Sequence, residues 1–186
     1  MSLKDKKVII DPGHGGKYPG VTEPKFASPE LRLEKVICLK VAKYMETILK
    51  REGAIVHMTR STDKDFGGTT AADDVNKRVA YINNNIPSSH ALVSIHVNTP
   101  KGRVGTFYQT GAVASKAFAE AVTAGLRPYS TGIGTYADNF AVLRDTTKAS
   151  QKVLVEIANI DDENLDYESR LNTIATGIVN GLRNHL

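Results

Sequence analysis

Two of the five histidines in this sequence follow apolar runs that are typical of buried strands. His14 lies in VIIDPGHGG over residues 8–16, and His96 lies in ALVSIHVN over residues 91–98. An apolar run that ends at proline and glycine predicts a strand that passes abruptly into a loop. Ligands of open α/β sheets bind outside the carboxyl ends of the strands. Because imidazole is a common ligand of zinc, the two histidines predict a zinc site.

A catalytic zinc site needs a third protein ligand and one open position for water. Glu34 is a candidate, because it stands at the start of a predicted helix just after the loop that leaves His14. A carboxylate at this place is also favoured by the helix dipole alone. Glu30, Glu23 and Asp11 remain alternatives that the spacing does not exclude.

Glu156 stands near the end of an otherwise apolar run, KVLVEIA over residues 152–158. Burying a carboxylate is costly unless it is paired or its pKa shifts. Close to a metal ion, such a group is a natural general base and acid for hydrolysis. The alternative is a strand-edge glutamate that faces solvent.

The other three histidines, His57, His90 and His185, carry no comparable signal and are expected to be structural or exposed. The sequence contains no glycine-rich phosphate loop that opens a helix and no Gly-x-Ser-x-Gly motif. Nucleotide binding and an α/β-hydrolase type of serine catalysis are therefore not expected.

The elements that must position these residues alternate between strands and helices. Strands are predicted over residues 8–11, 54–59, 91–97, 104–109, 140–143 and 153–157. Helices are predicted over residues 33–51, 73–85, 113–126 and 168–183. Such alternation predicts an α/β fold: a single three-layer domain with a mostly parallel sheet covered by helices on both faces.

The composition is that of an ordinary globular protein, with 41% hydrophobic and 24% charged residues. We expect all 186 residues to form one domain. The net charge of +4 is dispersed, so nucleic-acid binding is not expected. No apolar run approaches the roughly 20 residues of a membrane span. No signal peptide is evident, and the single cysteine, Cys38, excludes an intramolecular disulfide and is expected to be buried.

Four segments together resemble the zinc-dependent N-acetylmuramoyl-L-alanine amidases of bacterial cell-wall turnover and phage lysis. In order along the chain they are Asp11–Gly16, Leu33–Lys35, Ser94–Asn98 and Leu154–Glu156. Shorter similarities are found around Arg60, Arg78 and Leu143. The sequence departs from the family pattern in the proline-containing loop over residues 17–31 and in the residues that follow Glu156.

The resemblance implies a twisted sheet of about six strands. It implies that His14, Glu34 and His96 are ligands of Zn²⁺ and that Glu156 is the catalytic acid and base. The substrate would be peptidoglycan, cleaved between the lactyl group of N-acetylmuramic acid and L-alanine. Action would then be extracytoplasmic, at the cell wall, and we expect a monomer.

Two other functions remain open. One is a zinc peptidase or carboxypeptidase on a related fold, which the absence of a His-Glu-x-x-His motif disfavours. The other is a catalytically inactive module that binds the cell wall, which the presence of all four candidate residues disfavours.

Overall fold

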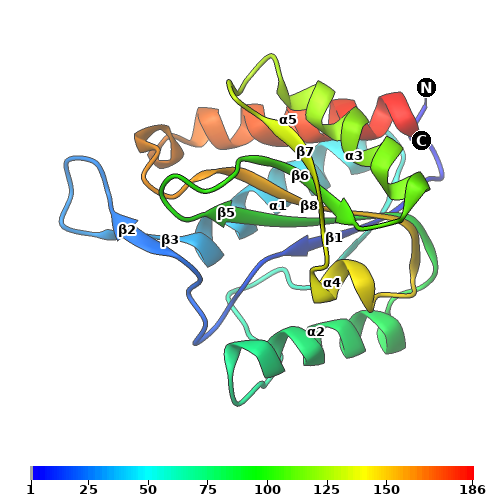
Figure 1. Ribbon diagram of the computed structural model, residues 1–186, viewed down its shortest axis with the longest axis horizontal. Coiled ribbons are helices and arrows are strands. Elements are labelled where there is room, and N and C mark those ends of the chain that lie inside the picture. Colours follow the sequence, from blue (N-terminus) through cyan, green and yellow to red (C-terminus); the bar gives the residue numbers. More distant parts are fainter. Residues whose placement is uncertain (1) are drawn as a thin grey trace.

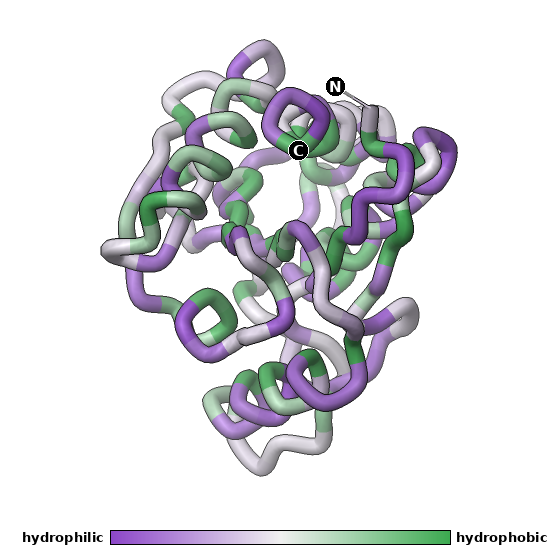
Figure 2. The backbone as a smooth tube through the Cα atoms, turned by 90° about the vertical axis from the view of Figure 1, so that its right-hand side faces the viewer, coloured by the Kyte–Doolittle hydropathy of each residue, from purple (hydrophilic) through white to green (hydrophobic). Residues whose placement is uncertain are grey.

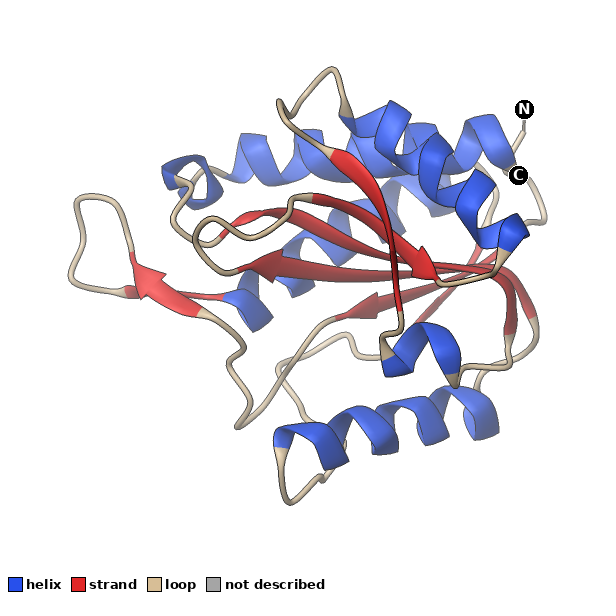
Figure 3. Ribbon diagram, in the orientation of Figure 1, coloured by secondary structure: helices blue, strands red, loops and turns tan. Residues whose placement is uncertain are grey.

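The apolar runs of the sequence form one six-stranded sheet in the computed structural model, which describes residues 2–186 (Figure 3). In spatial order the strands are β4 (Ile55–Met58), β1 (Lys7–Pro12), β5 (Ser89–Asn98), β8 (Ala149–Asn159), β6 (Gly105–Gln109) and β7 (Gly134–Asp138). The first four strands are mutually parallel. Strand β6 runs antiparallel to β8, and β7 runs parallel to β6. The carboxyl ends of β1, β5 and β8 therefore meet at one edge.

Helices cover both faces of this sheet, as Figure 1 shows. Three of them, α1 (Glu34–Arg51), α3 (Val113–Leu126) and α5 (Glu168–His185), pack on one face and against one another. The other face is covered by α2 (Ala71–Asn85) and the single-turn helix α4 (Ala141–Arg144). The predicted three-layer α/β fold is thereby confirmed.

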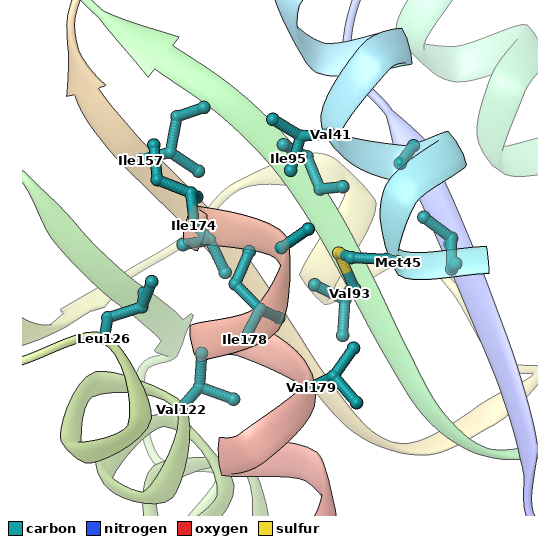
Figure 4. Close-up of a cluster of buried hydrophobic side chains, with 14 of the residues drawn as sticks. Val41, Met45, Val93, Ile95, Val122, Leu126, Ile157, Ile174, Ile178 and Val179 are labelled. Atoms are coloured by element: carbon teal, nitrogen blue, oxygen red, sulfur yellow. The ribbon is translucent and has the colours of Figure 1, made fainter. Parts of the chain in front are cut away.

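The larger core lies between the sheet and the three helices α1, α3 and α5. Figure 4 shows side chains of all three helices meeting those of β5 and β8. Helix α5 contributes the apolar positions that its spacing predicts, and Ile174 and Ile178 are fully buried. Cys38 is also buried in this core, as expected. Figure 2 shows that the helices carry both hydrophobic and hydrophilic residues, as elements with one covered face must.

The α2/α4 face of the sheet changes character along the strands. Its core contains Ile9 of β1, Leu92 of β5 and Leu154 of β8. Residues two positions apart on a strand share a face. Asp11, Ser94 and Glu156 therefore follow those three on the same face, each nearer the carboxyl end of its strand. Polar side chains thus gather where the strands end.

The structure corrects the prediction of a strand over residues 140–143. These residues begin α4, in which the backbone N–H groups of Leu143 and Arg144 donate to the Phe140 carbonyl. A short apolar run does not distinguish a strand from a buried helical turn, and here the helical turn forms.

The sequence patterns did not predict two elements of the structure. The edge strand β7 is half-exposed and lacks an apolar run. The loop over residues 17–31 contains a small antiparallel hairpin of β2 (Thr22–Pro24) and β3 (Leu31–Leu33). No helix within residues 2–186 combines the length and apolarity needed to cross a membrane.

Candidate active site

His14 and His96 meet at the carboxyl edge of β1 and β5. Their ring centroids are 5.0 Å apart, with one ring edge facing the other. A Cβ atom on Gly13 would lie 2.5 Å from Cε1 of His96, so only glycine allows the first loop to pass so close to the second histidine. His14 has a φ of 56°, a left-handed conformation that is uncommon for residues other than glycine and is found at functional sites.

Glu34 is the carboxylate that the fold brings to these histidines. It is the first residue of α1 and is buried. Its Oε2 lies 3.1 Å from Nε2 of His14, and its Oε1 lies 2.9 Å from Nδ1 of His96. The backbone N–H groups of Val21 and Val97 also donate to its two oxygens. Burial alone would raise the pKa of Glu34, but the histidines hold that pKa well below its usual range.

These three residues form a possible metal site, since one ligand atom from each lies within 4.8 Å of the others. Zinc lies ~2.0–2.2 Å from nitrogen and oxygen ligands, so two ligand atoms of a tetrahedral site are about 3.3 Å apart. The separations of 3.1 Å and 2.9 Å between the Glu34 oxygens and the ring nitrogens are close to that value. The donor set of two nitrogens and one oxygen suits zinc and leaves a fourth position for water.

The competing carboxylates do not contact the histidines. Glu23 lies on the β2–β3 hairpin, and Glu30, in the turn of that hairpin, is exposed and pairs with Lys25 at 2.5 Å. Asp11 is buried 2.7 Å from a guanidinium nitrogen of Arg78. Of the four candidates, only Glu34 contacts the histidines.

Glu156 lies beside His96 on the neighbouring strand, because the two residues are register partners between β5 and β8. Its Oε2 is buried and has no hydrogen-bond partner within the described chain. Burial, with a further contribution from the negative charge of Glu34, raises the pKa of Glu156 to about 8. A carboxyl group with such a pKa can exchange protons near neutral pH.

A buried network that sequence reasoning missed holds the loop of His14. Asp11 accepts hydrogen bonds from Thr59, Ser94 and Arg78, each at 2.7 Å. Burial opposes ionisation of Asp11, but the Arg78 charge and these hydrogen bonds outweigh it and lower its pKa to about 2. Arg78 also donates to the His14 carbonyl at 2.6 Å.

Arg60 supports the same loop from the other side. Its guanidinium donates to the carbonyls of Pro12 and Gly13, and also to that of Lys35 on α1. Arg60 and Arg78 stood in segments that resemble the amidase family, and that resemblance was their only signal in the sequence.

Beside the two histidines is a cavity of about 140 Å³ between α2 and α4. Most of its surface is apolar, and Tyr18, Val75, Phe140 and Leu154 contribute to it. The other three histidines lie away from this site. His57 is on β4, His90 accepts a hydrogen bond from the backbone N–H of Lys7, and His185 contacts Gln151.

Two histidines, a carboxylate that contacts both of them and a second carboxyl group with a buried oxygen, at the open edge of an α/β sheet, define a candidate metal-dependent hydrolase. The family of N-acetylmuramoyl-L-alanine amidases matches residues 8–184, a range that includes all four of these residues. The chain belongs to this family.

Individual relatives agree with that assignment. The chain is 35% identical to a probable cell wall amidase LytH of Staphylococcus saprophyticus, and the match covers 97% of this chain but 58% of the relative. It therefore spans less than two thirds of that protein. Among solved structures, the chain resembles the catalytic domain of CwlV, an N-acetylmuramoyl-L-alanine amidase from Paenibacillus polymyxa. The two are 32% identical and superimpose with a TM-score of 0.75, and the match covers 96% of this chain and 97% of that domain. An N-acetylmuramoyl-L-alanine amidase from Clostridium difficile is 27% identical with a TM-score of 0.79, over 97% and 96%.

Proposed function

We propose that this chain is a zinc-dependent amidase that cleaves peptidoglycan between the lactyl group of N-acetylmuramic acid and the L-alanine of the stem peptide. One observation carries the proposal: three ligand atoms within 4.8 Å of one another, with Glu156 next to His96 on the adjacent strand. Membership of the amidase family supports the choice of substrate.

His14, Glu34 and His96 would hold the zinc ion. When bound, zinc supplies Lewis acidity, which polarises the amide carbonyl and makes water a stronger acid. The lowered pKa of Glu34 keeps this ligand ionised, as metal binding requires. Its hydrogen bonds from Val21 and Val97 fix the carboxylate, so little reorganisation is needed to bind the ion.

Glu156 would move the proton. As general base it accepts a proton from the attacking water, and as general acid it delivers that proton to the departing alanine nitrogen. Glu156 stands in the apolar strand β8, near its carboxyl end. Its Oε2 has no hydrogen-bond partner in the described chain that would compete with the substrate or the attacking water. A separate residue for proton transfer leaves the three ligands free to bind the metal.

The whole of residues 1–186 would act as a single catalytic domain. Peptidoglycan lies outside the cytoplasm, so action there is part of the proposal, and the name of the staphylococcal relative supports it. We further propose that the domain works as a monomer, because all four candidate residues come from one chain.

Digestion of purified peptidoglycan tests this function. The zinc content of the protein is measured first, and the digest is then assayed for new amino termini and for their identity. We expect one zinc per chain and new L-alanine amino termini, with Glu156→Gln as the inactive control. New termini on any other residue would indicate a peptidase. Binding to the wall without any new termini would indicate an inactive wall-binding module.

A further inference from the structure

Arg103 and Tyr136 form a stacked pair on the Glu156 side of the site. The Arg103 guanidinium carbon lies 5.4 Å from the centroid of the Tyr136 ring. Arg103 precedes β6 by two residues, and Gly105, the first residue of β6, is the register partner of Glu156. Tyr136 pairs with Phe107 on the α2/α4 face, where Glu156 also lies. The pair therefore lies on the same face of the sheet as Glu156, one to two strands further toward the β7 edge.

Neighbouring residues constrain the positions of both members of this pair. Asn98, at the end of β5, donates from Nδ2 to the Arg103 carbonyl at 3.0 Å. The Tyr136 side chain folds back over Gly134, where a Cβ atom would collide with its hydroxyl group. Glycine at position 134 therefore leaves room for the Tyr136 ring. Gly134 is the register partner of Gly105, which in turn is the register partner of Glu156, so the ring lies near Glu156 along the sheet edge. The N–H of Gly134 donates to the Val104 carbonyl, which ties the two strands together next to Arg103.

Within residues 2–186, neither Arg103 nor Lys101 of the β5–β6 loop forms an ion pair, and of these two cations only Arg103 lies over an aromatic ring. Its side chain is exposed. The guanidiniums of Arg60 and Arg78 are buried against the His14 loop. Within residues 2–186 the arginines that form ion pairs are Arg32, Arg78, Arg144 and Arg183. An unpaired guanidinium stacked on an aromatic ring is oriented to bind a carboxylate through two parallel hydrogen bonds.

The chemistry of cleavage decides which part of the substrate reaches Arg103. The residue that protonates the departing nitrogen must lie on the amine side of the amide, so the stem peptide extends from Glu156 toward β6 and β7. Adjacent strands are about 4.8 Å apart. An extended peptide advances about 3.4 Å per residue, so the α-carboxyl carbon of the second residue of the stem lies about 6 Å from the scissile nitrogen, which belongs to the first residue. That distance lies between β6 and β7, where the stacked pair is found.

We propose that Arg103, oriented by Tyr136, binds the α-carboxylate of the second residue of the stem peptide and so selects peptidoglycan in which this group is free and not amidated. The inference rests on the proposed amidase function and adds the direction in which the substrate lies.

Lys17 offers a matched control on the other side of the site. Its Nζ lies 5.3 Å from the centroid of the Tyr18 ring, and Tyr18 lines the cavity beside the two histidines. Lys17 is thus also an exposed cation stacked on a tyrosine, but on the loop of His14. A substrate bound in the opposite direction would place its peptide carboxylate there.

The test compares two muramoyl tripeptides that differ only in having a carboxylate or a carboxamide on the α-carbon of the second residue, with the C-terminus amidated in both. We expect Arg103→Gln to reduce kcat/KM for the carboxylate substrate by about 10- to 100-fold, mainly through KM, and for the carboxamide by less than about 3-fold. Lys17→Gln should reduce kcat/KM equally little for both substrates.

Equal losses on the two substrates in Arg103→Gln would overturn the inference, as would a carboxylate-selective loss in Lys17→Gln. Binding of the corresponding free tripeptides, measured by calorimetry, gives a second readout that does not depend on hydrolysis. If the protein binds the carboxylate tripeptide through Arg103 but cleaves neither substrate, the amidase function fails and the carboxylate site stands. If it cleaves both substrates without any role for Arg103, the function stands and the inference fails.

Discussion

The two faces of the sheet use the same strands for different purposes. On the face covered by α1, α3 and α5, strand β5 is apolar along its length, with Val93, Ile95 and Val97 all buried. On the α2/α4 face, the same strand passes from buried Leu92 to Ser94 and then to His96 at its end. The face covered by α1, α3 and α5 therefore forms the larger core. On the α2/α4 face, polar side chains take the place of buried apolar ones near the strand ends.

The polar half of the second face is tolerated because nearly every buried group in it has a partner. Asp11 is paired with Arg78, and Glu34 accepts hydrogen bonds from two backbone N–H groups. Glu156 differs from these carboxylates, since its Oε2 is buried without a hydrogen-bond partner in the described chain. An unpartnered carboxyl group is costly to bury, and such costs are typically found at functional sites.

Removing a metal ligand gives the largest expected effect and acts on the second face alone. His96→Ala should lose most bound zinc and nearly all amidase activity, because a site with three protein ligands rarely tolerates the loss of one. His14→Ala and Glu34→Ala should behave alike. Zinc content by elemental analysis checks this, with Glu30→Ala as the control that keeps zinc. Full zinc occupancy in His96→Ala would contradict the ligand assignment.

Glu156→Gln separates chemistry from metal binding. The change keeps the shape of the side chain but removes the proton carrier, so turnover should fall by about 100- to 10,000-fold. Zinc content and the thermal unfolding temperature should stay close to those of the unchanged protein. Steady-state kinetics on a muropeptide measure the effect. Near-normal turnover would show that another carboxylate moves the proton, and Asp161, which follows the end of β8, would be the next to test. Lost zinc would instead make Glu156 a ligand.

Ile178→Ala probes the first face. Ile178 is fully buried in α5, and its truncation should lower the free energy of unfolding by about 2–5 kcal/mol through lost burial and a new cavity. The activity of the molecules that remain folded should not change, since the site lies across the sheet. Denaturant unfolding and kinetics at low temperature measure the two quantities. A changed KM in the folded variant would show that the two faces are coupled.

The smallest effect concerns the acid stability of the polar face. The pKa of Asp11 falls from its ordinary 3.8 to about 2 in the folded protein. A lowered pKa in the folded state means that the stabilisation is present above pH 3.8 and is lost as the pH falls toward 2. For metal-free protein, the free energy of unfolding should therefore drop by about 2 kcal/mol more in the unchanged chain than in Asp11→Asn over this range. Parallel pH profiles of the two proteins would contradict the assignment.

The sequence by itself determined the strand and helix alternation and the placing of His14, His96 and Glu156 at strand ends. These are local properties, because periodicity and chain-breaking residues are read within a short window. The position of Glu34 at the start of a predicted helix made it the first candidate for the third ligand, but the residues alone did not exclude Glu30, Glu23 or Asp11, and the resemblance to the amidases raised Glu34 above Glu30 and Glu23. Their roles as ligands and as proton carrier remain predictions.

Only the tertiary structure decided which carboxylate meets the histidines, that residues 141–144 form a helix, and that β6 and β7 run against the other strands. It also decided that Arg60 and Arg78 are buried under the His14 loop and that Arg103 stacks on Tyr136. Apart from the helical turn of α4, these features depend on contacts between residues that are distant in the chain. Their energies depend on burial and on partners that appear only when the sheet has assembled, and no local pattern of residues encodes them.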